Sequence, residues 1–325
     1  MSDCCPKVGE HEIIELCSSP SRRDSTTHET PRSDEFQQRQ ALIAAARAGD
    51  ADAQCHMGEV CRAGDQFTEQ DLAESLKWYT LAATQGHAGA QNDLGTMYCN
   101  GVGVADDLEE ATKWYRRAAD QGLAVAQFNL AMRYKCGKGV QADDHEAAVW
   151  FRKSADQGYV EAIGELGTLL RQGRGVTKSL PLAAQRHIAA ALAGDLLSRN
   201  ELTKYGAELE QEAHQGSMLA ALCLAKMHEA GLTVEKSEAT MFAWLMGGGY
   251  KGTHDDDPDV REELVDMRGH YAATLPDSVQ DEAWRLFGQM WSPNAQVLDN
   301  RPRDAEGNVI HDEADPLLGN SRGGD

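Results

Sequence analysis

A regular period of 36 residues runs through the middle of the chain and constrains its fold more than any other feature. Tryptophan followed by Tyr or Phe recurs at that interval, and so do Gln-Gly pairs and Gly-x-Gly-Val segments. The recurring positions are Trp78, Trp114 and Trp150; Gln85, Gln121 and Gln157; and Gly101, Gly137 and Gly173. A fixed period of 20–50 residues is typical of supersecondary units that stack on their neighbours. The chain is therefore predicted to form a repeat stack and not one closed globule.

Each period has the composition of a helix pair. In the second period, residues 88–100 are predicted to form the first helix, which Gly101 ends in a left-handed conformation. Asp107 and Glu110 have capping-box spacing for a second helix. That helix presents Ala111, Trp114, Tyr115 and Ala118 at helical spacing. The predicted fold class is all-α, an α-solenoid of stacked antiparallel helix pairs closed by a C-terminal capping helix pair.

The periodicity also predicts the domain boundaries. Residues 1–34 are polar and are expected to form a disordered leader, and residues 293–325 a disordered tail. Residues 35–250 form the predicted solenoid, with units at about 50–86, 87–122, 123–158 and 159–194 and a degenerate unit at 217–250. Residues 251–292 are predicted to be capping helices. The fourth unit has Arg186-His187 in place of the aromatic pair, so its second helix is expected to pack less tightly.

The net charge limits the classes of partner that the chain can bind, and the cysteines indicate its cellular compartment. The formal net charge of −21 disfavours nucleic acid and anionic membrane surfaces as partners. Residues 1–23 lack a secretory signal pattern, and no apolar run is long enough to span a membrane. The eight cysteines do not recur as pairs with the repeat. We therefore expect reduced thiols and a cytoplasmic protein.

The repeated residues resemble a known family. Residues 90–122 match nearly completely the pattern A-x3-LG-x2-Y-x2-GxGV-x2-D-x3-A-x2-WY-x2-AA-x-QG, and residues 126–158 match it with Ala131 in place of the first Gly. Residues 53–86 and 162–194 match less well. This pattern is similar to that of the Sel-one-like repeat, a relative of the tetratricopeptide repeat. The resemblance implies an adaptor for protein complexes, because the matched residues are structural.

Several motifs are better explained by structure than by chemistry. The Gly-x-Gly loops recur in every unit without a preceding strand, so they are interpreted as turns and not as phosphate cradles. Cys4, Cys5, His11 and Cys17 lack the CxxC spacing of a zinc site. Cys55 and His56 are expected to point outward, whereas Cys61 occupies a core position. The sequence thus predicts no catalytic, cofactor-binding or metal-binding residues, no cofactor and no enzyme activity.

The candidate binding residues are those that vary between units, whereas the cap, glycine and most aromatic positions recur. They lie three or four residues apart on the first helices, so each set shares one helix face. In tetratricopeptide-like stacks that face is concave. The set is His56, Glu59, Arg62, Asn92, Thr96, Phe128, Asn129, Met132, Lys135, Thr168 and Arg171. Arg62, Lys135 and Arg171 would form a basic ladder beside Phe128 and Met132, although an ordinary solvated face fits the same residues.

The sequence therefore supports a scaffold that binds a protein or peptide segment in its groove. Two alternatives stay open. One is a weak β-lactamase-like hydrolase, as implied by a cysteine-rich branch of the family. This chain departs from that branch because no cysteine pair joins its helices. The other alternative is a secreted effector that contacts a host.

Overall fold

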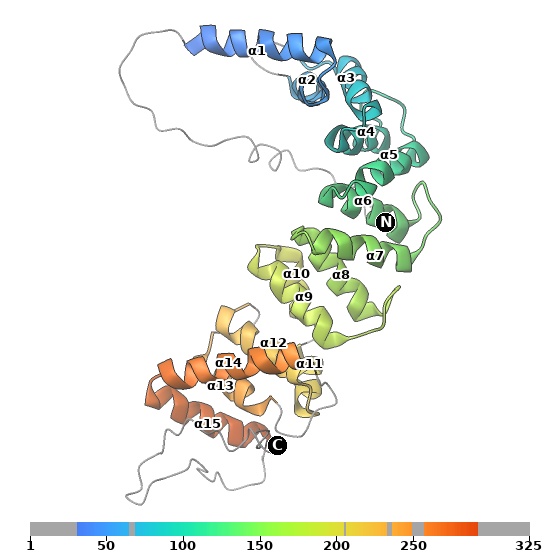
Figure 1. Cartoon of the computed structure of the whole chain (residues 1–325). Helices are drawn as coiled ribbons and strands as arrows, with labels where there is room; N and C mark the ends of the chain where they lie inside the picture. Colours follow the sequence, from blue (N-terminus) through green and yellow to red (C-terminus); the bar gives the residue numbers. More distant parts are fainter. Residues whose placement is uncertain (1–30, 65–68, 205, 233–235, 249–256, 292–325) are drawn as a thin grey trace, which may run out of the picture. The chain divides into compact units, whose positions relative to one another are not determined.

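The computed structural model describes residues 31–64, 69–204, 206–232, 236–248 and 257–291. Within these residues the chain forms fifteen α-helices and no strand, which confirms the all-α prediction (Figure 1). The expected disordered leader and tail lie outside the described residues. The exception is residues 31–34, which belong to the first helix and not to a leader.

The chain divides into two compact units by its internal contacts. The first unit extends to Ala162 and includes Arg174–Val176, and the second contains Ile163–Gly173 and the chain from Thr177 onward. The helices of the first unit are α1 (Pro31–Ala48), α2 (Ala51–Ala63), α3 (Leu72–Thr84), α4 (Ala88–Asn100), α5 (Leu108–Asp120), α6 (Ala124–Cys136) and α7 (Asp144–Ala155). Helices α2/α3, α4/α5 and α6/α7 are the predicted pairs, and each packs on the next.

Most of helix α8 (Val160–Gln172) belongs to the second unit. The remaining helices are α9 (Leu180–Leu192), α10 (Leu196–Leu202), α11 (Gly206–His214), α12 (Met218–Ala230), α13 (Glu238–Gly247), α14 (Pro258–Thr274) and α15 (Asp277–Trp291). The last two lie within residues 251–292, where the capping helices were expected. Trp291 of α15 packs so closely on Gly247 that a Cβ there would lie 2.0 Å from the indole ring.

The second helices begin at the predicted caps. The Asp107 carboxylate accepts a hydrogen bond from the backbone N–H of Glu110 at 2.9 Å, and Asp71 accepts one from Glu74 at the same distance. These bonds satisfy backbone donors that a helix N-terminus otherwise leaves without partners. Glu110 itself forms an ion pair with Lys113 at 2.9 Å. The local sequence therefore sets where each second helix starts.

The glycine loops hold consecutive repeats together, as their structural interpretation requires. Gly139 has a φ of +73°, and a Cβ at this position would lie 1.9 Å from the carbonyl oxygen of Leu108 in the preceding repeat. Gly95 leaves room for the ring of Tyr115, since its Cβ would lie 2.9 Å from that ring. Only glycine permits such backbone approach, so the loops are packing elements.

A ladder of hydrogen-bonded glutamines joins successive helix pairs. The repeat pattern alone did not explain why these glutamines recur. Gln91 donates to the carbonyl of Ala83 at 3.0 Å and accepts from Gln121 at 2.7 Å. The equivalent bonds join Gln54 to Ala46 and Gln85, and Gln127 to Ala119 and Gln157. In the fourth repeat the two equivalent positions hold Ile163 and Ala193, so both members of the pair are replaced together.

The fourth repeat also differs at its aromatic pair. His187 takes the buried position of Tyr115, and its ring packs against Gly167. Its Nδ1 lies 3.1 Å from the hydroxyl of Ser198 on α10. Burial lowers the pKa of His187 to about 4. Arg186 is partly exposed where Trp114 is buried.

The cysteines correct two expectations. Cys55 was expected to point outward, but it is 7% exposed and belongs to the core around Tyr79 and Leu94. Cys61 is buried, as expected, and Cys55, Cys61, Cys136 and Cys223 form no disulfide. Cys99 is disulfide-bonded, so the expectation that every thiol is reduced is wrong at that position.

Candidate protein-binding face

The first-helix face is the side of α2, α4 and α6 that carries the candidate residues of the first unit. His56 and Glu59 are exposed on this face, and Arg62, Thr96, Met132 and Lys135 are half-buried. Asn92, Phe128 and Asn129 are buried. The candidates of the second unit, Thr168 and Arg171, are half-buried on α8. The face therefore combines accessible residues with polar residues that lie between the helices.

The middle of the first-helix face is a neutral polar network. Asn129 donates to the side-chain carbonyl of Asn92 at 2.9 Å. The hydroxyl of Thr96 accepts from or donates to the hydroxyl of Tyr115 at 3.1 Å, and it also donates to the backbone carbonyl of Asn92. Buried polar groups normally find such partners. Between α4 and α6 the face satisfies its own hydrogen bonds.

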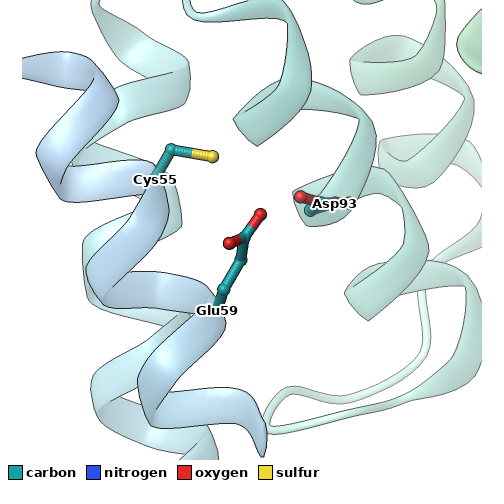
Figure 2. Close-up of side chains that lie close together, drawn as sticks. All are labelled: Cys55, Glu59 and Asp93. Atoms are coloured by element: carbon teal, nitrogen blue, oxygen red, sulfur yellow. The ribbon is translucent and has the colours of Figure 1, made fainter. Parts of the chain in front are cut away.

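Between α2 and α4 the equivalent positions hold ionisable groups. The thiol of Cys55 and the carboxylates of Glu59 and Asp93 lie within 4.8 Å of one another. Figure 2 shows Cys55 and Glu59 on one helix, opposite Asp93 on the next. Cys55 and Glu59 are four residues apart on α2, so they share a face.

The environment of this cluster disfavours its charged forms. Burial, together with the charges of Asp93 and Glu59, raises the pKa of the Cys55 thiol to about 12. Burial and the charge of Glu59 raise the pKa of Asp93 to about 6, against the opposing effect of Arg62. A thiol with such a pKa is a poor nucleophile at neutral pH, which argues against the hydrolase alternative at Cys55.

The predicted basic ladder is partly neutralised by the chain's own carboxylates. Arg171 forms an ion pair with Glu201 at 2.9 Å within the second unit. Arg62 lies close enough to Asp93 to lower the pKa of that carboxyl. The net positive charge that these arginines offer to a partner is therefore smaller than the sequence alone suggested.

Phe128 contributes more to the core than the sequence indicated. Its ring is 8% exposed and packs against Phe151 and Tyr159, with ring centroids at 5.6 and 5.1 Å. The expectation that Phe128 lies off the buried stripe is wrong. Half-buried Met132, one turn further along α6, is the more accessible apolar side chain.

The sequence did not single out Tyr79 for this site, and it placed Asp93 among the varying first-helix positions without linking it to Cys55. A signal for Asp93 exists in the repeat register. Asn92 bonds to Asn129, the residue after its own equivalent in the next repeat, and Cys55 stands in the same relation to Asp93. The varying positions therefore meet across repeats with an offset of one residue.

The family comparison agrees with the helix pairs. A family model for the Sel1 repeat matches residues 51–87, 88–123, 124–159 and 160–195. These four segments contain α2/α3, α4/α5, α6/α7 and α8/α9. No curated protein shows significant sequence similarity to this chain.

Several solved structures are similar to the chain, and two of them are bacterial repeat proteins. One is c5321, a protective antigen present in uropathogenic Escherichia coli strains and displaying an SLR fold. It is 25% identical with a TM-score of 0.51, and the match covers 79% of this chain and 64% of the antigen. The chain thus spans less than two thirds of the antigen's length. The other is a Sel1 repeat protein from Oxalobacter formigenes, 26% identical with a TM-score of 0.49, covering 69% of this chain and 96% of that one.

The described helices were also assessed for membrane spans. None of them is both long enough and apolar enough to cross a bilayer.

Proposed function

This chain is a Sel1-repeat protein, and on that premise we propose that it is a non-enzymatic scaffold that binds a protein or peptide segment along its first-helix face. One observation supports the proposal above all. Caps, glycines and glutamines repeat from unit to unit, whereas residues at equivalent positions of the first helices differ in size and charge. Stacked repeats use such variable positions to recognise extended partners.

The varying residues suggest the chemistry of the partner segment. Lys135 and Met132 lie one turn apart on α6, and both are half-buried. A segment that carries a carboxylate beside an apolar side chain would complement this pair. Arg62 and Arg171 would add to the attraction, even though neighbouring carboxylates reduce their net charge.

Affinity capture with the full-length chain tests the proposal. Proteins captured from a lysate of the source organism are identified by mass spectrometry and then measured as purified partners. We expect Lys135→Glu and Met132→Ala to weaken binding of the purified partner by about tenfold or more, and added salt to weaken it further.

The matched control is Lys113→Glu, which reverses a lysine on the second helix α5 that is paired with Glu110. Its affinity should stay within about twofold of the parent. If Lys113→Glu weakens binding and the α6 variants do not, the second helices are the binding surface. Phe128→Ala is a poor probe because it removes part of the core.

One comparison favours a second candidate function. The similarity to a protective antigen supports an exported protein that contacts a host. Detection of the tagged chain in culture supernatant, with a cytoplasmic marker retained in the cells, would favour this alternative over a cytoplasmic scaffold.

A further inference from the structure

We propose that Cys55, Glu59 and Asp93 form a binding site for a divalent transition-metal ion, with Zn²⁺ as the ion that suits the donors best. The sequence predicted no metal site, because the three residues show no ligand motif. The fold brings them together from two helices of successive repeats (Figure 2). The proposal concerns an ion and does not depend on the proposed binding of a protein partner.

The geometry permits coordination after a small movement. The three donor atoms lie within 4.8 Å of one another. Zn²⁺ bonds of about 2.0–2.3 Å in a tetrahedron place donor atoms about 3.5 Å apart. Glu59 is exposed and its flexible side chain can supply most of the closure. Gly89 of α4 lies beside the thiol, since a Cβ there would lie 4.0 Å from Cys55 Sγ.

The donor set is selective. One thiolate with two carboxylates is a mixed soft and hard set, whereas Mg²⁺ and Ca²⁺ prefer oxygen ligands alone. Because Glu59 is exposed, a fourth position can be filled by water. That arrangement has three protein ligands and one open position, which Zn²⁺ accepts.

The next repeat provides an internal comparison that points to a missing ligand. There, Asn92, Thr96 and Asn129 occupy the positions of Cys55, Glu59 and Asp93 and are joined by hydrogen bonds among themselves and to Tyr115. Neutral amides and hydroxyls satisfy one another in this way. A thiol and two carboxylates have no such mutual donors when ionised, so a cation would complete the set.

Tyr79 supplies a second, independent observation. Tyr79 is the equivalent of Tyr115, is fully buried, and has a hydroxyl for whose proton no acceptor is found among the described residues. The charges of Asp93 and Glu59 both act on this hydroxyl, which places it beside the cluster. The guanidinium of Arg62 interacts with this hydroxyl, but a guanidinium can only donate, so the hydroxyl proton still lacks an acceptor. Water or a carboxylate ordered by a bound ion would give the Tyr79 hydroxyl the acceptor that Thr96 gives Tyr115.

Binding must displace protons, and this makes it dependent on pH. A metal-bound thiolate releases the proton of Cys55, and Asp93 also coordinates in its charged form. Arg62 is a competing positive charge at the site. The proposal therefore predicts that affinity rises with pH and that removing Arg62 strengthens binding. A purely structural salt-bridge cluster predicts neither result.

The experiment uses the full-length chain in a phosphine reductant, with Cys4, Cys5, Cys17 and Cys99 replaced by Ser. These replacements remove the cysteines near the N-terminus and the Cys99 thiol that reduction of its disulfide would release. Co²⁺ alone is the first probe, because a cobalt–thiolate bond gives a charge-transfer band and tetrahedral Co²⁺ has strong visible absorption. Zn²⁺ should displace Co²⁺ and bleach both signals. Calorimetry of Zn²⁺ binding in buffers of different ionisation enthalpy then measures the protons released.

We expect Cys55→Ser to abolish the cobalt–thiolate band, and Asp93→Asn to weaken Zn²⁺ binding by about tenfold or more. Arg62→Ala should tighten it. Cys136→Ser, which removes a thiol from α6 that forms no disulfide, is the matched control and should bind like the parent. Circular dichroism confirms that each variant keeps its helices.

Three results would overturn the proposal. One is a cobalt–thiolate band that persists in Cys55→Ser. Another is Zn²⁺ affinity that is unchanged in a folded Asp93→Asn. The third is the absence of any thiolate band at millimolar Co²⁺ in the parent. If binding disappears when Cys4, Cys5, Cys17 and Cys99 are replaced while Cys55 is intact, one of those thiols is a ligand and the assignment to Cys55, Glu59 and Asp93 fails.

Discussion

Replacement of Asp93 by Asn is expected to stabilise the metal-free chain at neutral pH. Burial, with the nearby charge of Glu59, raises the pKa of Asp93 from 3.8 to about 6. The folded chain therefore holds a proton that the unfolded chain releases between about pH 4 and pH 6. In that interval stability falls as pH rises, and above it the folded state carries the full cost of a charged Asp93.

The size of this cost follows from the two pKa values. A difference of about two pH units at about 1.36 kcal/mol each gives about 3 kcal/mol as an upper limit. Asp93 is partly exposed and faces Arg62, so we expect about 1–2 kcal/mol in practice. Asn is nearly isosteric, and an amide also preserves a polar contact with Asn92. Asp93→Asn should therefore gain this amount at pH 7 and nearly none at pH 4.

Urea unfolding followed by circular dichroism at both pH values, with a chelator present, measures the effect. Asp120→Asn is the control, because it removes the same charge from the exposed end of α5. It should change stability by less than about 0.5 kcal/mol at either pH. A loss of stability in Asp93→Asn at pH 7 would refute the reasoning, because the charged carboxylate would then be stabilising the fold.

Three further predictions concern packing and titration. Trp114→Ala should cost about 3–5 kcal/mol of unfolding free energy, and Arg186→Ala at the equivalent position about 1 or less; equal costs would disprove the repeat register. Gly139→Ala and Gly122→Ala both place a side chain at positive φ, but only Gly139 lacks space, so its variant should lower the melting temperature far more. His187 has a pKa lowered to about 4, so stability should fall as pH drops from about 6.5 to about 4, and His187→Gln should flatten that dependence in melting curves.

The sequence predicted the helix pairs and their boundaries because the residues that set them repeat. Gly101, Asp107 and Trp114 recur with the same interval, and each has one local role that does not depend on which repeat carries it. The predicted first helix of the second period, 88–100, coincides with α4. Period, caps and helix stops are properties of short segments, so they can be derived without knowing how the segments meet.

The site could be predicted only in part, because it depends on contacts between repeats. Cys55 was placed outward from the pattern of its own helix, but α4 covers it. Arg133 occupies the position of Met97 and is 1% exposed, with its guanidinium over the ring of Tyr115. A charged residue in an apolar column becomes understandable only when the neighbouring helix is in place.

The glutamine ladder shows why some repeated residues vary as pairs. Gln91 is 5% exposed, and its side-chain carbonyl depends on Gln121 for a donor. Gln121→Ala leaves that buried acceptor unsatisfied, which should cost about 1–2 kcal/mol. Gln91→Leu should cost a similar amount by removing the donor to Ala83.

In the double variant, however, the unsatisfied acceptor is itself gone, so the total should fall short of the sum by about 1 kcal/mol. A double-mutant cycle from urea unfolding measures this coupling energy. Simple additivity would mean that the two glutamines act independently. The presence of Ile163 and Ala193 at both positions in the fourth repeat would then have no energetic explanation. A positive coupling would explain that replacement, because losing one glutamine removes most of the penalty for losing the other.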